Sequence, residues 1–292
     1  MPTTLEYTIP SMTGRTVVIT GANSGLGKAA ALVLAGVDAR VVLAVRSLEK
    51  GRAAAEAMGG DVEVRELDLA DLGSVRSFAE TFTDPIDILI NNAGIMIPPL
   101  RRTAEGFESQ FGTNHLGHFA LTNLLLPQIR DRVVTLSSLA HKSGAIDFDD
   151  LNWERRPYKP MVAYGQSKLA NLLFTSELQR RLTECSSPVI AIAAHPGLAA
   201  TNLFGRSGHR VRDAISAAAI GLISQSEQHG ALPTLCAATA DIPGNSYVGP
   251  GGFQQTRGEP KLVGRSAEAS DAEVARRLWT VSEELTGIGF PL

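Results

Sequence analysis

The sequence predicts an α/β protein, a single-domain, doubly wound parallel sheet with helices on both faces. Three observations predict this fold. Short apolar, β-branched segments alternate with longer helical stretches over the first two-thirds of the 292 residues. Most of these segments are apolar at nearly every position, as expected for strands that are buried on both faces. No linker, internal repeat or low-complexity tract divides the chain. We therefore expect an N-terminal extension over residues 1–13 and one domain over residues 14–292.

Six strands are expected along the chain. They are 16–20 (TVVIT), 39–45 (ARVVLAV), 62–67 (VEVREL), 86–90 (IDILI), 132–137 (RVVTLS) and 189–194 (VIAIAA). The stretches between these segments are long enough for crossover helices. Because crossovers between parallel strands are right-handed, a doubly wound order is the simplest topology.

Two segments are longer than simple connections, residues 140–163 and about 202–261. Both follow predicted strands, and ligands of open α/β sheets bind beyond the carboxyl ends of the strands. We therefore expect both segments to border a ligand site, with a substrate loop at about 202–225. We interpret its apolar part, 213–223, as a lid over a lipophilic substrate. Contact with a membrane surface and a helix that faces the core are the alternatives.

Composition and charge exclude several classes of protein. A formal net charge of -3 argues against a general nucleic-acid binder, which would carry a basic surface. The two cysteines, Cys185 and Cys236, lie too far apart in the sequence to indicate a disulfide framework or a zinc site, which favours a reducing compartment. The N-terminus lacks the pattern of a signal peptide, and no apolar run approaches the roughly 18 residues of a membrane-spanning helix. We therefore expect a cytoplasmic protein.

The glycine-rich segment 20–27 (TGANSGLG) lies between the first predicted strand and a helix. Such a turn brings together free backbone N–H groups and the positive end of a helix dipole, which favours an anion such as the pyrophosphate of a dinucleotide. The spacing of its glycines differs from the common GxGxxG pattern, and a tight connection without a ligand is the alternative. The residues expected at the cofactor are Gly21, Asn23, Ser24, Gly25, Leu26 and Gly27.

The second predicted strand ends with LAVRS, which places Arg46 where sites for NAD usually carry an acidic residue. An arginine can form charge-assisted hydrogen bonds with a 2′-phosphate, whereas an acid would repel it. The sequence therefore predicts NADP(H) rather than NAD(H). A solvated cation at a strand end is the alternative interpretation.

The segment YGQSK places Tyr164 and Lys168 four residues apart, on one face of a helix. An ammonium group near a tyrosine favours the phenolate and lowers its pKa from about 10, as a proton-transferring group at neutral pH requires. This spacing alone is common. It is accompanied by four further segments, which are NNAG (91–94), NHLGHF (114–119), TLSS (135–138) and HPG (195–197).

Together these motifs resemble the short-chain dehydrogenase/reductase family, in its classical branch, whose fold is the Rossmann fold. TGxxxGxG, NNAG, a helical Asn, Ser, YxxxK and PG occur here in that order, and the resemblance extends from about Gly14 to the C-terminus. Within the family, residues 147–174 and 277–287 are most similar to the retinol dehydrogenase and WW-domain oxidoreductase group.

The resemblance implies a catalytic tetrad of Asn114, Ser138, Tyr164 and Lys168. Tyr164 would exchange a proton with the substrate oxygen, and Ser138 would hydrogen-bond the same oxygen. Lys168 would lower the pKa of the tyrosine and hold the nicotinamide ribose. Asn114 would anchor a water that links Lys168 to solvent. Because side chains alternate along a strand, Ser137 should point to the other face.

The resemblance also implies further contacts with the cofactor. Asp68 would otherwise be an ordinary helix N-cap, a role that Asp71 could equally take. The residues implied are Asp68 and Leu69 at the adenine, Asn92, Ala93 and Gly94 on the adenosine side, and Pro196, Gly197 and Thr201 at the nicotinamide.

The expected function is an NADP(H)-dependent oxidoreductase that moves a hydride between nicotinamide and a lipophilic alcohol, ketone or aldehyde. A light-dependent enzyme similar to protochlorophyllide reductase and an NADPH-sensing regulator without turnover are the alternatives. The resemblance also implies a homodimer or homotetramer, formed through the helices that carry Asn114 and Tyr164. No metal site is expected, because His115 and His118 lack a third ligand and are interpreted as ordinary helix residues.

Overall fold

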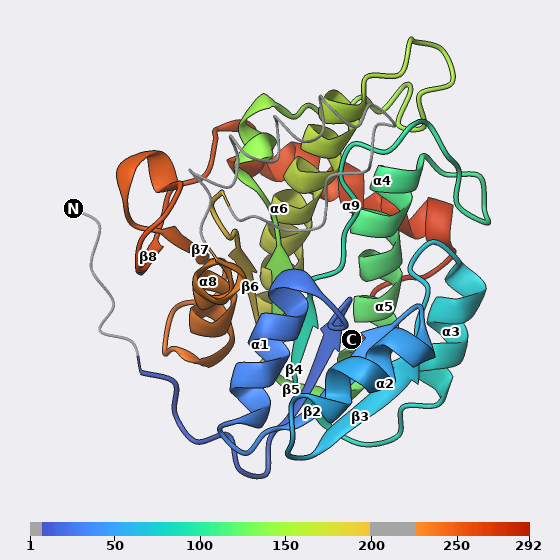
Figure 1. Ribbon diagram of the computed structural model, residues 1–292. Coiled ribbons are helices and arrows are strands. Elements are labelled where there is room, and N and C mark those ends of the chain that lie inside the picture. Colours follow the sequence, from blue (N-terminus) through green and yellow to red (C-terminus); the bar gives the residue numbers. More distant parts are fainter. Residues whose placement is uncertain (1–7, 199–225) are drawn as a thin grey trace, which may run out of the picture.

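The computed structural model describes residues 8–198 and 226–292. Its centre is an eight-stranded sheet with the strand order β3-β2-β1-β4-β5-β6-β7-β8 (Figure 1). Pairing is parallel from β3 to β7, and only β8 is antiparallel to its neighbour. The strands are β1 (Thr16–Thr20), β2 (Arg40–Val45), β3 (Val62–Glu66), β4 (Ile86–Asn91), β5 (Ile129–Leu136), β6 (Ile190–Ala194), β7 (Tyr247–Pro250) and β8 (Pro260–Leu262). The predicted doubly wound sheet is confirmed.

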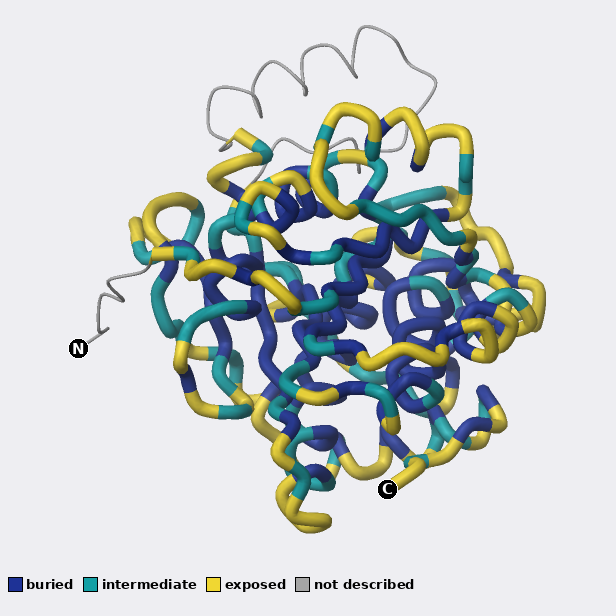
Figure 2. Tube along the Cα trace, turned by 90° about the horizontal axis from the view of Figure 1, so that it is seen from below, coloured by how far each residue is buried: buried dark blue, intermediate teal, exposed yellow. Residues whose placement is uncertain are grey.

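Helices cover both faces of the sheet. They are α1 (Gly25–Ala35), α2 (Leu48–Glu56), α3 (Leu72–Glu80), α4 (Ser109–Phe111), α5 (Gly117–Leu125), α6 (Pro160–Glu184), α8 (Glu227–Thr239) and α9 (Ala272–Thr286), and a π-helical turn, η1 (Gly112–Leu116), joins α4 to α5. Helices α1, α2 and α8 share one hydrophobic core, and α3, α5, α6 and α9 share the other. Along β1, Val18 faces the second core while Val17 and Ile19 face the first, because successive side chains of a strand point to opposite faces. Figure 2 shows the buried interior between exposed loops.

All six predicted strands are present, with small differences at their ends. β5 begins at Ile129, three residues before the predicted start, and ends at Leu136. Strands β7 and β8 were not predicted, because each is short and the β7 sequence Tyr-Val-Gly-Pro has no apolar run of strand length. The predicted substrate loop at about 202–225 lies outside the described residues.

The C-terminal helix α9 packs over α5 and α6, the two helices expected to form a subunit interface. The Trp279 ring stacks on Phe174 of α6 at 5.7 Å between centroids and meets Phe119 of α5 edge-on at 4.9 Å. Within this one chain, residues 117–123 of α5 and 163–175 of α6 are all buried. The chain's own C-terminal helix and sheet therefore cover this part of the two helices, and the expected contact between subunits stays a prediction for their remaining surface.

Candidate active site

A cleft with a volume of about 320 Å³ opens at the carboxyl ends of β1 to β4. All twelve residues predicted around the adenosine and pyrophosphate line it, namely Gly21, Asn23, Ser24, Gly25, Leu26, Gly27, Arg46, Asp68, Leu69, Asn92, Ala93 and Gly94. Four further residues that no motif indicated also line it, namely Ala44, Leu67, Ile95 and Thr113. Each lies within two positions of a predicted residue in the sequence. They could have been found by extending each motif by one or two residues.

The glycine turn fits close approach by a dinucleotide. Gly21 has a φ of 67°, a left-handed conformation that favours glycine. A Cβ added to Gly27 would lie 2.4 Å from Asn92 Nδ2 and 2.9 Å from the carbonyl of Gly21, so a side chain there would push the turn apart. Ser24 precedes α1 without a side-chain capping bond, and no acidic residue lies in the first turn. The first N–H groups of α1 are therefore free of a competing carboxylate within the helix, as an anion site requires.

The end of β1 is tied to the turn that follows β4. The Thr20 hydroxyl accepts hydrogen bonds from the backbone N–H groups of Asn92 and Ala93, both at 2.9 Å. Asn92 in turn donates through Nδ2 to the carbonyl of Thr20 at 2.8 Å. The two walls of the cleft are thus held together by residues of the predicted motifs.

Arg46 and Asp68 lie at the ends of neighbouring strands and line the same cleft. The side chain of Asp68 accepts from the N–H of Ala70 at 2.9 Å. Asp71, not Asp68, caps α3, since its carboxylate accepts from the N–H groups of Gly73 and Ser74. This settles the alternative left open by the sequence and leaves Asp68 at the cleft.

A smaller cavity, of about 40 Å³, adjoins the cleft and shares Leu26, Asn92, Gly94 and Ile95 with it. Its other lining residues are Leu136, Ser137, Tyr164, Lys168 and Pro196. The cleft therefore leads directly to the predicted catalytic pair and to the first residue of the predicted nicotinamide-flanking segment. Gly197 follows with a φ of 69°, and Thr201 lies outside the described residues.

Tyr164 is buried, and burial raises its pKa to about 12, while a hydrogen bond with Ser138 opposes this shift. The direction is opposite to the one expected from the sequence, because loss of solvent outweighs any effect of the neighbouring lysine. Lys168 is also buried, which lowers its pKa to about 8. Its Nζ lies 5.7 Å from the centroid of the Tyr164 ring and donates to the carbonyl of Leu136 at 3.2 Å.

The two adjacent serines have separate partners. Ser138 precedes a short 3-10 turn and interacts with the Tyr164 hydroxyl. Ser137 forms part of the cavity wall, but its hydroxyl donates to the carbonyl of Lys168 at 2.7 Å. The hydroxyl of Ser138 is therefore the one that bonds to Tyr164, but Ser137, which was expected on the other face of the strand, lines the cavity and Ser138 does not.

Asn114 lies in the π-helical turn η1, a type of helix that is frequent at functional sites. Its side-chain oxygen accepts from the N–H of Ile95 at 2.8 Å, and its Nδ2 donates to the carbonyl of Ile95 and to Ser167 Oγ. Ser167 Oγ donates to the carbonyl of Tyr164 at 2.8 Å. The Asn114 amide thus links the cleft wall to the helix that carries Tyr164.

One strained backbone position lies close to the site. Ile97 has a φ of 56°, which a β-branched residue rarely adopts. The buried Gln110 holds it, since Oε1 of Gln110 accepts from the N–H of Ile97 at 2.9 Å. Nε2 of Gln110 donates to the Tyr158 hydroxyl and to the carbonyl of Pro160, where α6 begins. No sequence motif indicated Gln110, which holds both the loop after Gly94 and the start of the Tyr164 helix.

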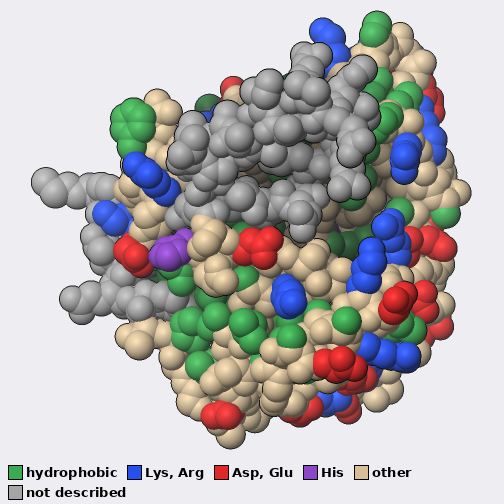
Figure 3. Space-filling model, viewed as in Figure 1, with side chains coloured by type: hydrophobic (Ala, Val, Ile, Leu, Met, Phe, Trp, Pro, Cys, Tyr) green, Lys and Arg blue, Asp and Glu red, His purple; other side chains and the backbone are tan. Residues whose placement is uncertain are grey.

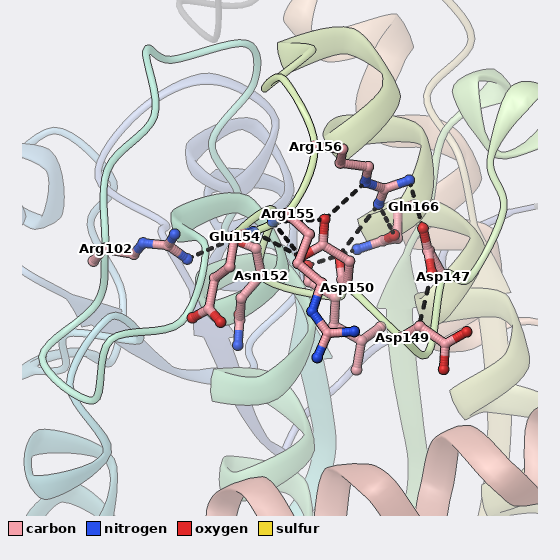
Figure 4. A network of polar contacts seen from close by, with 10 residues as sticks. Arg102, Asp147, Asp149, Asp150, Asn152, Glu154, Arg155, Arg156 and Gln166 are labelled. Atoms are coloured by element: carbon pink, nitrogen blue, oxygen red, sulfur yellow. Dashed lines mark hydrogen bonds and ion pairs between the residues drawn. The ribbon is translucent and has the colours of Figure 1, made fainter.

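A polar network fixes the segment that precedes α6 (Figure 4). The Arg156 guanidinium pairs with Asp147 and Asp150 and lies over the ring of Trp153. Gln166 of α6 donates to the carbonyl of Leu151 at 3.1 Å. The segment is therefore attached to the helix two residues beyond Tyr164.

The described parts of the chain contain neither a candidate metal site nor a candidate membrane-spanning helix. Among residues 8–198 and 226–292, no group of three or more His, Cys, Asp or Glu side chains could hold a metal ion. No helix in these residues has the length and apolar character needed to cross a membrane. On the face shown in Figure 3, charged side chains of both signs are interspersed.

A cleft with a glycine turn beside a cavity lined by the buried Tyr164 and Lys168, at the carboxyl ends of a doubly wound parallel sheet, is typical of the nucleotide-dependent oxidoreductases of the α/β class. The chain belongs to the short-chain dehydrogenase family, whose model ("short chain dehydrogenase") matches residues 15–211. The predicted membership, and the predicted similarity to the retinol dehydrogenase group, are confirmed.

Similar proteins include retinol dehydrogenase 13 of Homo sapiens, which is 45% identical over 98% of this chain and 88% of that protein. Retinol dehydrogenase 12 of Mus musculus is 42% identical over 94% of this chain and 87% of that protein. Among solved structures, an uncharacterized protein from Mycobacterium Paratuberculosis is 55% identical, with 97% of both chains covered and a TM-score of 0.84. A structure from Beutenbergia cavernae that contains NADP is 26% identical, covering 78% of this chain and 91% of that one, with a TM-score of 0.59.

Proposed function

We propose that the protein is an NADP(H)-dependent oxidoreductase that transfers a hydride between nicotinamide and a lipophilic alcohol, ketone or aldehyde. The observation that carries this proposal is the continuity between the cleft at the glycine turn and the cavity lined by Tyr164 and Lys168. When bound, the nicotinamide supplies or accepts the hydride. The retinol dehydrogenase relatives support a substrate that reacts at an alcohol or carbonyl carbon.

The chain's own residues handle the proton. With its pKa raised to about 12, Tyr164 carries its proton at neutral pH and can donate it to a carbonyl oxygen that gains negative charge. Ser138, hydrogen-bonded to Tyr164, stabilises the same oxygen. Lys168, with a pKa of about 8, is largely protonated at pH 7 and is the group that can return a proton toward the tyrosine.

Exposed apolar side chains near the cavity support a lipophilic substrate. Met161 and Val162 lie within one helical turn of Tyr164 and are 52% and 39% exposed. Leu198 follows Gly197, and its N–H donates to the carbonyl of Thr256 in the loop that carries Phe253, which is 82% exposed. Met161, Val162 and Leu198 thus leave apolar surface on the segments that flank Tyr164 and Pro196, which suits a ligand with an apolar body.

The choice of cofactor is assigned to Arg46. Replacing it with aspartate should lower kcat/KM for NADPH at least about tenfold, because a charge-assisted bond of about 1.5–3 kcal/mol is lost and a like charge is introduced beside the 2′-phosphate. Initial rates with NADPH and NADH, measured for wild type and Arg46→Asp, check this. Arg52→Asp on α2 makes the same change of charge without lining the cleft and is the matched control. A wild-type preference for NADH that Arg46→Asp leaves unchanged would contradict the assignment.

The function itself is tested by NADPH oxidation and NADP reduction across a panel of carbonyls and alcohols of increasing apolar size, in darkness and in light. We expect turnover in both conditions, with kcat/KM rising with the apolar size of the substrate. Turnover only in light would favour the protochlorophyllide-reductase-like alternative. NADPH binding without turnover on any substrate would favour the regulator.

We further infer a cytoplasmic protein that forms a homodimer or homotetramer. The free thiols of Cys185 and Cys236 agree with a reducing compartment. Because the chain itself covers the middle of α5 and α6, contact between subunits along these helices is assigned to their partly exposed residues, such as Leu124, Ser176 and Arg180.

A further inference from the structure

His118, the second residue of α5, is 1% exposed, and both of its ring nitrogens have polar partners. Nδ1 lies 3.0 Å from the backbone carbonyl of Asn114. Nε2 lies 2.9 Å from the hydroxyl of Thr20. One histidine ring therefore spans from the π-helical turn that carries Asn114 to the end of β1.

The partners fix the tautomer of the ring. A carbonyl oxygen can only accept, so Nδ1 carries the hydrogen and donates to Asn114. Burial lowers the pKa of His118 to about 4, and the charge of Lys168 acts in the same direction. The ring is therefore neutral at physiological pH, and Nε2 is an acceptor.

The direction of the next bond follows from this tautomer. The structure gives the Thr20 hydroxyl two acceptors, His118 Nε2 at 2.9 Å and the carbonyl of Ile90 at 3.4 Å. The shorter bond is the one to the histidine, so Thr20 donates its hydrogen to His118. With its hydrogen directed at the histidine, the Thr20 oxygen has its lone pairs available to the N–H groups of Asn92 and Ala93, both at 2.9 Å. A one-directional chain of bonds thus runs from the cleft wall through Thr20 and His118 to Asn114.

We propose that His118 is a positioning residue that couples the cofactor-binding turn 91–94 to Asn114. The proposal rests on the proposed function of the site. The two ring nitrogens have different effects in this proposal, and these effects can be tested separately. Acceptance at Nε2 orients Thr20 and so supports cofactor binding, whereas donation from Nδ1 holds the π-helical turn and so supports turnover.

Two substitutions separate these parts. An asparagine side chain can place its amide near the position of Nδ1, and a glutamine side chain near that of Nε2. His118→Asn should therefore keep the bond to Asn114 and lose the bond to Thr20. His118→Gln should do the reverse, and His118→Phe should lose both.

The experiment measures the Kd for NADPH by fluorescence titration and kcat at saturating NADPH. Loss of one buried hydrogen bond predicts about a tenfold rise in Kd for His118→Phe and His118→Asn, with His118→Gln within about threefold of wild type. For kcat the pattern reverses, with about a tenfold fall in His118→Phe and His118→Gln and near-normal values in His118→Asn.

His115→Asn is the matched control, because its shorter side chain loses the contact made at the Nε2 position. His115 is equally buried, three residues away, but its Nε2 bonds to Ser282 of α9 and not to the cleft. We expect this variant to lower the melting temperature without changing the Kd for NADPH. If all His118 variants bind NADPH as wild type does, or if their losses only follow melting temperature as in His115→Asn, the proposal is wrong.

Thr20 supplies a second route to the same link if His118→Phe does not fold. Thr20→Ser keeps the hydroxyl and should keep the wild-type Kd for NADPH, whereas Thr20→Val should raise it about tenfold. Equal Kd values for these two variants would overturn the cofactor part of the proposal. If wild type binds NADPH but turns over no substrate, the proposed function fails while the Kd pattern still tests the His118–Thr20 bond.

Discussion

Tyr164→Phe is expected to lower kcat for carbonyl reduction by about 10²- to 10⁴-fold, the range that a positioned general acid contributes. The hydroxyl that is removed is the one that interacts with Ser138 and that carries a proton at neutral pH. The ring itself remains, so the packing of α6 and the Kd for NADPH should stay close to wild type. Steady-state kinetics and an NADPH titration of the same preparation check both expectations.

Tyr247→Phe is the matched control for this loss. Tyr247 is another buried tyrosine whose pKa burial raises, and it lies in β7 outside the residues that line either cavity. Tyr247 interacts with Ser137 and Tyr164 but does not line the cavity, so its substitution removes a buried phenol hydroxyl beside the site and should leave kcat within about threefold of wild type. Full turnover by Tyr164→Phe would contradict the assignment of Tyr164 to proton transfer.

Lys168→Met is expected to abolish turnover and yet to stabilise the fold at pH 7. Burial lowers the pKa of Lys168 from its ordinary 10.5 to about 8. At pH 7 the folded protein therefore bears the cost of a buried charge, on the order of 3 kcal/mol by the conversion of pKa into free energy. The carbonyl of Leu136 keeps a donor in the variant, because Asn171 Nδ2 also bonds to it at 2.9 Å. We expect a net gain of about 1–3 kcal/mol in the free energy of unfolding.

This gain depends on pH in a defined direction. Between about pH 8 and pH 10.5, the unfolded chain binds a proton at Lys168 that the folded chain does not bind. The contribution of Lys168 to the free energy of unfolding of the wild type therefore becomes less unfavourable as the pH rises across that window. The difference between Lys168→Met and wild type should be largest at pH 7 and close to zero at pH 10.5, which denaturant unfolding at both pH values measures. A variant less stable than wild type at pH 7 would show that the ammonium is stabilised in the fold.

The strands of the sheet and most of the cleft could be predicted from the sequence because they depend on local patterns. A buried parallel strand is apolar at nearly every position, as in residues 16–20. Glycine is required where a side chain would collide with neighbouring atoms of the turn, as at Gly27. The order of the motifs then placed Tyr164, Lys168, Ser138 and Asn114 near one another.

Other features depend on long-range packing and could not be predicted in this way. The pKa of Tyr164 depends on how deeply the helix is buried, which a lysine four residues away does not reveal. The amphipathic sequence of α9 indicates one apolar face but not which helices it covers. Gln110 and His118 act through partners distant in the sequence, Pro160 and Thr20, so no spacing rule indicates them.

A crystal structure of the protein with NADPH would reveal where the nicotinamide ring binds relative to Tyr164. We expect the nicotinamide ring beside Leu26 and Pro196, with its reactive carbon facing a space that the Tyr164 hydroxyl also reaches. A substrate carbon held about 3–3.5 Å from that ring carbon could then accept the hydride while its oxygen accepts the proton of Tyr164. A ring bound elsewhere, with Tyr164 remote from it, would contradict the account.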